Sequence, residues 1–302
     1  MTFVHSHPNL NETVFRLMKN QDMQYEVIVV DSLSTDRTIE ISKKYNVEII
    51  ILENFRSPST AKYIGYLNSF GKTVFFLDGD MEILMDYSNL KKCINYTITD
   101  KVAGVQGSLK DYFNGEMINH LRQVKEPTSV NFLPGSAIYS RIALEKNNFN
   151  PNLNSNEERE LGYRIKKTGF EMKILPFVMA KHKRRFNVGG LMEISRRHKN
   201  SYYLGLGQVL RANLGSPIIF LKHLVNQKVS VMFFLTFILI PISFGINMIL
   251  TYSLLALHFS AILYYSARYK SISRYIDKFL QLWGILYGFI TYSNKKIEYK
   301  KV

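Results

Sequence analysis

The feature that most constrains the fold is a stretch of 39 residues, 229–267, that contains no Lys, Arg, Asp or Glu. A helix needs roughly 20 apolar residues to cross a bilayer once, so this stretch is nearly long enough for two crossings. Pro241 and the segment SFGIN interrupt it, which argues against one very long helix. We expect a hairpin of two membrane helices at about 229–246 and 248–267, with a very apolar soluble core as the alternative.

Basic residues flank this stretch on both sides. The chain has 39 Lys and Arg against 24 Asp and Glu, a formal net charge of +15. Residues 181–228 and 268–301 are rich in Lys and Arg, whereas most acids precede residue 172. Cationic flanks stay on the cytoplasmic side of a membrane, and a two-helix hairpin puts both flanks there. The charge therefore indicates contact with anionic membrane lipids rather than with nucleic acid.

The N-terminal residues MTFVHSHPNLNET have neither the basic head nor the apolar stretch of a signal peptide. We therefore expect the part before the hairpin to be cytoplasmic, in a multi-pass protein of the cell membrane. Cys93 is the single cysteine, which excludes an intramolecular disulfide and any metal site built from several cysteines.

Two further segments surround the predicted hairpin. Residues 189–228 are basic and amphipathic, and we expect linker helices that lie at the membrane interface, or an ordinary surface helix. Residues 268–302 form a basic C-terminal segment with a short apolar run at 279–292 that includes Trp283. This run is expected to be interfacial or packed against other helices, with a third membrane segment as the alternative.

The first part of the chain alternates short apolar runs with helix-like segments. EVIVVD (26–31), VEIIIL (47–52) and KTVFFLD (72–78) have the near-continuous apolar character of strands buried on both faces. Helix-like segments at 34–45 and 57–70 separate them. This order predicts an α/β domain with a largely parallel sheet flanked by helices. The pattern also predicts strands at 102–109 and 170–176, a further segment of the domain at 136–141, and a helix at about 156–167.

Acidic residues follow two of the predicted strands. Asp31 ends the first strand, and Asp78-Gly79-Asp80 follows the third. Ligands of open parallel sheets bind at the carboxyl ends of strands. Carboxylates suit Mg²⁺ or Mn²⁺, which take one or two of them together with phosphate oxygens of a substrate. We interpret the Asp78–Asp80 turn as a site for a metal ion and a phosphate; a simple acidic turn is the alternative.

Neither of the two common phosphate loops occurs. The sequence has no GxGxxG after a strand and no GxxxxGK[ST], which argues against dinucleotide oxidoreductases and P-loop enzymes. Phosphate is therefore expected to meet a metal ion and basic groups such as Lys62 or Arg56.

Two adjacent acids, Glu157 and Glu158, begin the predicted helix at 156–167. They precede Leu161 by four and three residues, and therefore share the side of the helix that Leu161 and Ile165 mark as buried. Acids in a first turn favour the helix dipole, which is sufficient to explain such a pair. A carboxylate facing a cleft there could also act as a general base.

Four stretches together resemble the family-2 glycosyltransferases of the GT-A fold, in order and spacing, over about residues 10–185. They are EVIVVDSLSTDRT, SPSTAKYIGYLNSFGKTVFFLDGD, PGSAIYSR and NEERELGYRIKKTG. The resemblance implies a GT-A nucleotide-diphospho-sugar transferase domain at 1–188, followed by the C-terminal membrane helices. The hairpin is similar to that of anchored members that act on lipid-linked or cell-envelope glycan acceptors.

The resemblance also implies the chemistry: a hexosyltransferase-like enzyme with a nucleotide-sugar donor, Mg²⁺ or Mn²⁺, and an inverting displacement. Asp31 would contact the nucleoside, and Lys62, in place of the family's usual Arg, the diphosphate. Asp80, the second acid of the DxD motif, would bind the metal that bridges the diphosphate, while Asp78 would hold the ribose or support the metal. His182 lies where some members place a metal or phosphate contact.

The same resemblance makes Glu158, the second acid of the family's ED motif, the base that deprotonates the acceptor, with Glu157 beside it. Three departures accompany it: Ser32 in place of an acid, Glu-Glu in place of Glu-Asp, and only TFVHSHPN in place of the family's first strand. The last departure indicates either a truncated start or a shortened strand. The QxxRW signature of processive synthases is absent, which favours transfer of a single sugar. The short first strand motivates an alternative, a catalytically impaired nucleotide-sugar-binding relative or a membrane scaffold in a glycan-assembly complex.

Overall fold

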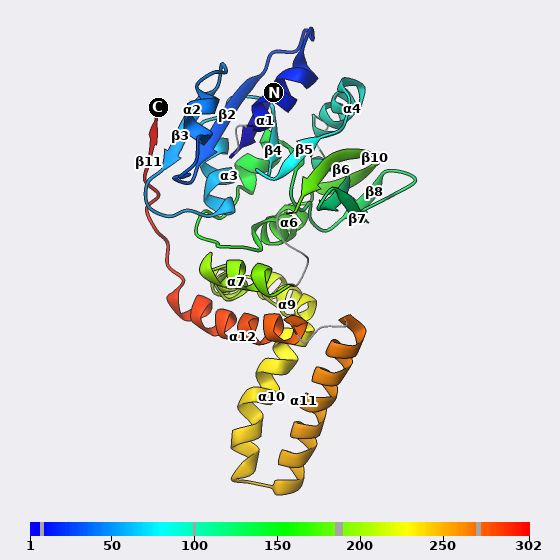
Figure 1. Ribbon diagram of the computed structural model, residues 1–302, viewed down its shortest axis with the longest axis vertical. Helices are drawn as coiled ribbons and strands as arrows, with labels where there is room; N and C mark the ends of the chain where they lie inside the picture. The colour runs from blue at the N-terminus through cyan, green and yellow to red at the C-terminus, as the bar shows by residue number, and fades with distance from the viewer. Residues whose placement is uncertain (7–8, 99–100, 185–189, 270–272) are drawn as a thin grey trace. The chain divides into compact units, whose positions relative to one another are not determined.

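The computed structural model describes all residues except 7–8, 99–100, 185–189 and 270–272. The chain divides into two compact units (Figure 1). The first unit comprises Met1–Arg185 and Asn294–Val302, and the second comprises Phe186–Ser293.

The first unit is built on one mixed sheet, to which eleven strands among the described residues contribute. Its order is β11-β3-β2-β1-β4-β9-β6-β10-β5, with β7 beside β6 and β8 beside β10, and the run β3-β2-β1-β4 is parallel. The strands are β1 (Thr2–His5), β2 (Glu26–Asp31), β3 (Glu48–Leu52), β4 (Thr73–Leu77), β5 (Met81–Ile83), β6 (Val102–Phe113), β7 (Glu116–Leu121), β8 (Thr128–Val130), β9 (Ala137–Ser140), β10 (Glu171–Lys183) and β11 (Tyr299–Lys301).

Helices cover both faces of this sheet (Figure 1). Neighbouring residues of one strand belong to different hydrophobic clusters: Phe3 and Phe75 lie in one, Val4 and Phe76 in the other. Since successive side chains of a strand point to opposite faces, both faces are buried, which explains the continuous apolar runs. The helices are α1 (Asn9–Met18), α2 (Thr38–Ser42), α3 (Pro58–Leu67), α4 (Tyr87–Thr97), α5 (Arg141–Lys146) and α6 (Glu157–Lys167).

The shortened first strand occupies the centre of the sheet. All four residues of β1 are buried, and they pair in parallel with β2 on one side and β4 on the other. Gly71, just before β4, makes this possible, because a Cβ there would lie 2.6 Å from the backbone nitrogen of Thr2. The short segment at the start of the chain therefore still supplies a central strand.

One predicted helix is shorter than expected. The segment 34–45 forms α2 only over Thr38–Ser42, and neither Ser34 nor Thr35 caps it. The backbone N–H of Ser34 instead donates to Oδ2 of Asp31 at 2.9 Å. The carboxylate at the end of β2 therefore holds the following residues in a turn and delays the helix.

The second unit is helical in its described residues. Its helices are α7 (Leu191–Lys199), α8 (Leu204–Ala212), α9 (Pro217–Asn226), α10 (Lys228–Phe244), α11 (Met248–Tyr269) and α12 (Ser273–Thr291). The predicted segments 229–246 and 248–267 correspond to α10 and α11. Pro241 lies inside α10, as the predicted bounds of the first helix imply, and the break between the two helices falls at residues 245–247, within SFGIN.

Glycines bring α8 and α12 into close contact. A Cβ on Gly207 would lie 2.0 Å from the carbonyl oxygen of Ile285, and a Cβ on Gly288 would lie 2.2 Å from that of Leu204. Small residues at a crossing allow helix backbones to approach closely. The apolar run 279–292 thus packs against another helix, one of the two arrangements expected, while Trp283 remains 52% exposed.

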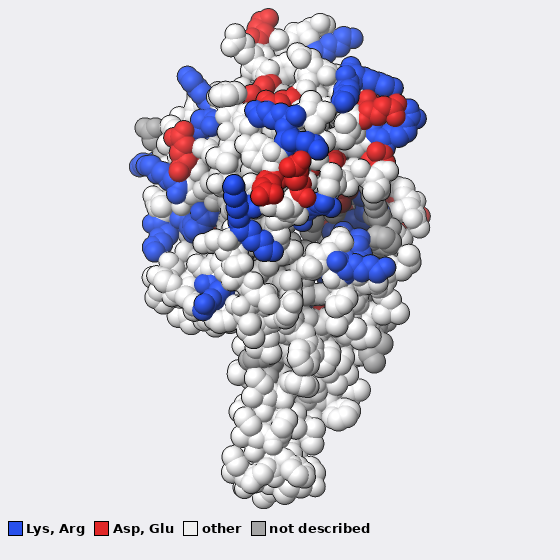
Figure 2. Space-filling model, turned by 90° about the vertical axis from the view of Figure 1, so that its left-hand side faces the viewer, with Lys and Arg blue, Asp and Glu red and all other residues white. Residues whose placement is uncertain are grey.

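One described helix is long and apolar enough to cross a membrane, the segment Met248–Arg268 of α11. A second candidate exists only if α9 and α10, which are bent by 85° at their junction, count as one span. Between Lys228 and Arg268 the α10–α11 hairpin has no Lys, Arg, Asp or Glu, and the face in Figure 2 is accordingly white over its far end. Length and composition thus support one or two candidate spans, and the multi-pass topology stays a prediction.

The end of the chain returns to the first unit as a strap, residues 294–302, which the sequence analysis missed. β11 pairs antiparallel with the edge strand β3 (Figure 1). Asn54 Nδ2 donates to the carbonyl oxygen of Lys296 at 2.7 Å, and the backbone N–H of Lys295 donates to Asn152 Oδ1 at 2.8 Å. The strap therefore covers an edge that would otherwise expose unpaired backbone groups.

Deletion of residues 294–302 is expected to destabilise the first unit by roughly 2–4 kcal/mol, because several backbone hydrogen bonds worth about 1 kcal/mol each are lost. Hydrogen exchange of the β3 amides should become faster, and the unfolding temperature of the solubilised chain should fall. The matched control is Lys300→Gln, which removes only an exposed ion pair with Glu53 worth about 1 kcal/mol or less. Equal β3 exchange in the truncated and intact chains would contradict the strap's structural role.

Candidate active site

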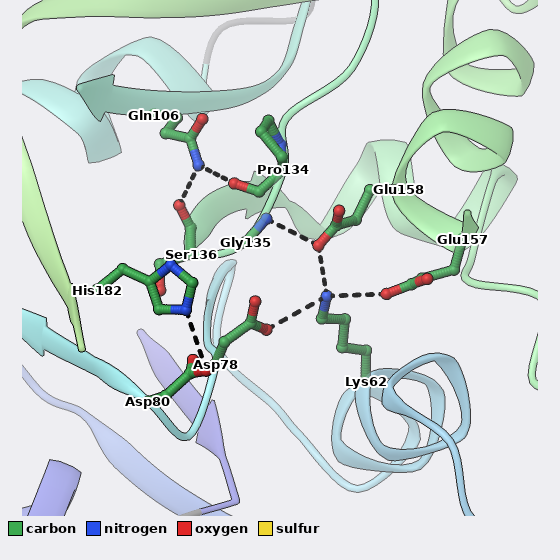
Figure 3. A network of polar contacts seen from close by, with 10 residues as sticks. All are labelled: Lys62, Asp78, Asp80, Gln106, Pro134, Gly135, Ser136, Glu157, Glu158 and His182. Carbon is green, nitrogen blue, oxygen red and sulfur yellow. Dashed lines mark hydrogen bonds and ion pairs between the residues drawn. The ribbon is translucent and has the colours of Figure 1, made fainter. Parts of the chain in front are cut away.

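Three carboxylates surround one buried lysine in the first unit (Figure 3). Lys62 Nζ lies 2.7 Å from Glu158 Oε1, 3.3 Å from Glu157 Oε1 and 3.4 Å from Asp78 Oδ1, and its side chain is 7% exposed. Burial lowers the pKa of Lys62, but the three acids outweigh burial and raise the pKa well above its ordinary value. Lys62 is therefore charged and engaged by the protein's own acids.

Local sequence fixes where Lys62 lies. Ser57 caps α3 by accepting a hydrogen bond from the backbone N–H of Thr60 at 3.0 Å, and Pro58 occupies the first helical position. Lys62 then begins the second turn of α3. Arg56, the other basic group considered for phosphate, lies before the cap and donates from Nη2 to the carbonyl oxygen of Glu53.

Glu158 receives two hydrogen bonds on the same oxygen. Besides Lys62, the backbone N–H of Gly135 donates to Oε1 at 2.8 Å. Gly135 has a φ of +67°, a conformation that suits glycine, and Gln106 donates from Nε2 to the carbonyl oxygens of Pro134 and Ser136 (Figure 3). Among the described residues Oε2 of Glu158 has no hydrogen-bond partner, so this oxygen is available to a substrate.

A glycine in α6 lets the Pro134–Ser136 loop approach Glu158. A Cβ on Gly162 would lie 2.3 Å from the carbonyl oxygen of Asn131 and 2.7 Å from Cβ of Phe132. The segment that leads to Gly135 therefore lies directly against α6. The motifs PGSAIYSR and NEERELGYRIKKTG then meet at the hydrogen bond from Gly135 to Glu158.

The surroundings of Glu158 tune its acidity. Burial, followed by the neighbouring charges of Glu157 and Asp78, raises the pKa of Glu158 to about 7, although the Lys62 cation opposes the shift. A general base is most effective when its pKa is close to the working pH. Glu158 has the acidity and the free oxygen that a base requires.

Asp31 lies at the end of β2 and is 1% exposed. Its Oδ2 accepts the backbone N–H of Ser34, whereas Oδ1 is buried without a partner among the described residues. A buried carboxylate oxygen without a donor is costly, and a ligand N–H or O–H group would satisfy it. This environment fits the predicted contact with a nucleoside.

Asp80 contacts His182 rather than the lysine (Figure 3). His182 Nε2 lies 3.0 Å from Asp80 Oδ2, and Nδ1 lies 2.8 Å from Asp111 Oδ1. Burial lowers the pKa of His182, but the hydrogen bonds to Asp80 and Asp111 outweigh burial and raise it. Asp111 was missed in the sequence because it is one acid in the long strand β6, far from any recognised motif.

The predicted metal ligands are thus divided between two neighbouring groups. Asp80 pairs with His182, while Asp78 Oδ1 faces Lys62. Within the described parts of the chain, no three His, Cys, Asp or Glu residues form a group that could hold a metal ion by itself. The Asp80–His182 pair nevertheless suits Mg²⁺ or Mn²⁺, since such ions bind one or two protein ligands and take the rest from substrate phosphates.

Substitution of Lys62 by Met is expected to destabilise the protein by roughly 3–5 kcal/mol near pH 8, because three acids lose their shared cation. This loss of stability should become smaller as the pH falls, since protonation of the three carboxylates relieves the repulsion among them. Denaturant unfolding at several pH values measures both effects, with Lys91→Met on the exposed face of α4 as the control. A loss independent of pH would contradict the electrostatic explanation.

Comparison with known proteins identifies a family for this chain. Residues 1–167 of 302 match the model of the family described as "Glycosyl transferase family 2". No curated protein is similar enough to count as a sequence relative.

Solved structures show the fold. The mannosyltransferase PcManGT from Pyrobaculum calidifontis, in complex with GDP-Man and Mn²⁺, has a TM-score of 0.58 at 15% identity, over 96% of this chain and 86% of that one. S. aureus TarS 1–349 in complex with UDP-GlcNAc has a TM-score of 0.50 at 19% identity, over 74% of this chain and 72% of that one. The predicted α/β GT-A class is confirmed. With the family model matched over more than half of its length, the chain belongs to glycosyl transferase family 2 and is an enzyme that transfers a sugar from a nucleotide-sugar donor.

Proposed function

We propose that the protein is an inverting, metal-dependent glycosyltransferase that moves one sugar from a nucleotide-diphosphate sugar to a lipid-linked or cell-envelope glycan acceptor. The observation that carries the proposal is the environment of Glu158. One oxygen of this carboxylate is held by Lys62 and Gly135, and the other has no hydrogen-bond partner among the residues that the structure describes. A fixed carboxylate with a pKa of about 7 is suited to remove a proton from an acceptor hydroxyl.

The step is a single displacement. Oε2 of Glu158 takes the hydroxyl proton as the acceptor oxygen forms a bond to the anomeric carbon of the donor sugar. The bond from that carbon to the diphosphate oxygen breaks, and the diphosphate leaves with the electron pair. Attack from the face opposite the leaving group inverts the anomeric centre. Lys62 and Gly135 keep the base in place while its charge changes.

The donor is proposed to bind between the carboxyl ends of β2 and β4. Oδ1 of Asp31 would accept a hydrogen bond from the nucleoside, since it is buried and has no partner in the described part of the chain. Asp80 and His182 would hold the divalent ion, and Asp78 would contact the ribose beside Lys62. When bound, Mg²⁺ or Mn²⁺ neutralises the charge that develops on the departing diphosphate. Lys62 acts on the carboxylates here rather than on the diphosphate.

The membrane assignment rests on the second unit. An uncharged hairpin with basic flanks is suited to cross or enter a bilayer and to bind anionic membrane lipids. An enzyme held there meets acceptors that are themselves carried by lipids. We therefore infer a cytoplasmic catalytic domain at the cell membrane.

The pH dependence of turnover tests the base. Release of UDP from UDP-GlcNAc and of GDP from GDP-mannose, with Mn²⁺ and membrane lipid extract as acceptor source, should rise with pH through about 7 and then level off. Activity rises because the deprotonated form of Glu158 is the active one. Glu158→Gln should lower the turnover rate by roughly 10²–10⁴-fold.

The matched variant is Glu157→Gln. It removes one of the charges that raise the pKa of Glu158. The enzyme should still turn over, and the rise of its activity with pH should occur at a lower pH. If Glu157→Gln abolished turnover and Glu158→Gln did not, the base would be Glu157. If neither variant altered the rate, the proposed mechanism would be wrong.

Membrane attachment is tested by extraction with alkaline carbonate. The intact chain should remain with the membranes, and Leu257→Arg, near the middle of α11, should release it in part. An arginine at the centre of a membrane helix costs roughly 2.5–3.5 kcal/mol. Ile142→Arg, at an exposed position of α5, is the control, and this variant should remain with the membranes as the intact chain does. Complete release of the unaltered chain would argue against an integral anchor.

A further inference from the structure

We propose that Asp111 is a positioning residue for the divalent ion, acting through His182. The proposal rests on the function proposed above, in which Asp80 and His182 hold that ion. Asp111 lies in β6, and neither the sequence motifs nor the family match assigns it a role. Its place in the sheet and its hydrogen bonds supply the argument.

The order of three strands brings the three side chains into a row. β10 lies between β6 and β5. In this register His182 of β10 is opposite Asp111 of β6 on one side and Met81 of β5 on the other. Asp80 immediately precedes Met81, and its carbonyl oxygen accepts the backbone N–H of Lys183 at 2.8 Å. Strand pairing thus fixes the imidazole between the two carboxylates.

Asp111 is placed to act on His182 and not on a ligand. Its side chain is 2% exposed, and both oxygens have partners. Oδ1 lies 2.8 Å from His182 Nδ1, and Oδ2 accepts a hydrogen bond from Arg184 Nη2 at 2.8 Å. This hydrogen bond from the Arg184 guanidinium fixes the plane of the Asp111 carboxylate.

This arrangement determines which ring nitrogen can bind a cation. A carboxylate can only accept a hydrogen bond, so it holds the imidazole proton on Nδ1. With that proton kept on Nδ1, the neutral ring has its lone pair on Nε2, the nitrogen 3.0 Å from Asp80 Oδ2, and a divalent ion bound between Nε2 and Asp80 would replace the hydrogen bond that joins them. Carboxylates behind metal-binding histidines commonly set the tautomer and orientation in this way.

Because of its contact with Arg184, Asp111→Asn tests whether Asp111 sets the position of the imidazole proton of His182. Arg184 only donates, so the amide oxygen of the new Asn is expected to turn toward the guanidinium and its NH₂ group toward His182 Nδ1. A donor at Nδ1 moves the imidazole proton to Nε2, where it blocks the ligand position. The shape of the side chain is almost unchanged, so a loss of binding reports the proton and not the packing.

The experiment measures Mn²⁺ binding by the full-length protein in the presence of UDP, from the electron paramagnetic resonance signal of free Mn²⁺. Asp111→Asn is expected to weaken binding roughly 10–100-fold. His182→Ala should weaken it similarly, and the double variant should be no worse than His182→Ala, because Asp111 acts only through the ring. Glu82→Gln, an acid of β5 paired with Lys183, is the control and should bind normally.

The outcomes separate this inference from the proposed function. Absence of Mn²⁺ binding by the unaltered protein, or unchanged binding in Asp80→Asn, would overturn the metal site itself. Loss of binding in Asp80→Asn and His182→Ala with normal binding in Asp111→Asn would overturn only the role of Asp111. Additive losses in the double variant would also overturn it.

A second variant keeps the test decisive if Asp111→Asn does not fold, as judged from its melting temperature. Arg184→Gln leaves the carboxylate in place but replaces the guanidinium that orients it. It should weaken Mn²⁺ binding several-fold in the protein that retains His182, and it should not change Mn²⁺ binding in the His182→Ala variant. An equal effect of Arg184→Gln in both backgrounds would overturn the proposal.

Discussion

The buried ammonium group of Lys62 is the interaction on which the catalytic site depends. Three carboxylates from two separate parts of the chain, the turn after β4 and the start of α6, converge on this one cation. Without it, burial and mutual repulsion would force the acids to take up protons or move apart. With it, Asp78 and Glu157 stay close to Glu158 and raise its pKa to about 7, while Lys62 limits the rise. A structural ion cluster thus also sets the strength of the proposed base.

A second polar group lies beside this cluster and has a different task. Asp80, the next acid after Asp78, faces His182 instead of Lys62. The two acids of the DGD turn therefore take part in two neighbouring networks. Asp78 pairs with Lys62 beside the proposed base Glu158, and Asp80 is part of the proposed cation site. Gly79 between them carries no side chain, so the turn can direct the two carboxylates to different partners.

Much of the fold and part of the site could be predicted. The alternation of apolar runs and helices indicates the α/β sheet because strands buried on both faces need apolar residues at every position. Asp31, Asp80 and Glu158 were recognisable because they stand at strand ends or a helix start. Asp111 and the strap gave no comparable signal, since one acid in a strand and a short basic tail are common in many folds. Lys62 stands where the family has a diphosphate-binding Arg, but the sequence could not show the three acids that engage its ammonium group.

The sequence by itself determined the class of fold, the uncharged hairpin with its basic flanks, and the acids around which a donor site could form. These follow from patterns within single segments, where periodicity and composition act locally. Only the tertiary structure decided which groups meet: β11 on β3, Lys62 with three acids, and His182 between Asp80 and Asp111. Such contacts join residues tens to hundreds of positions apart, and strand order and register, which no single segment encodes, bring them together.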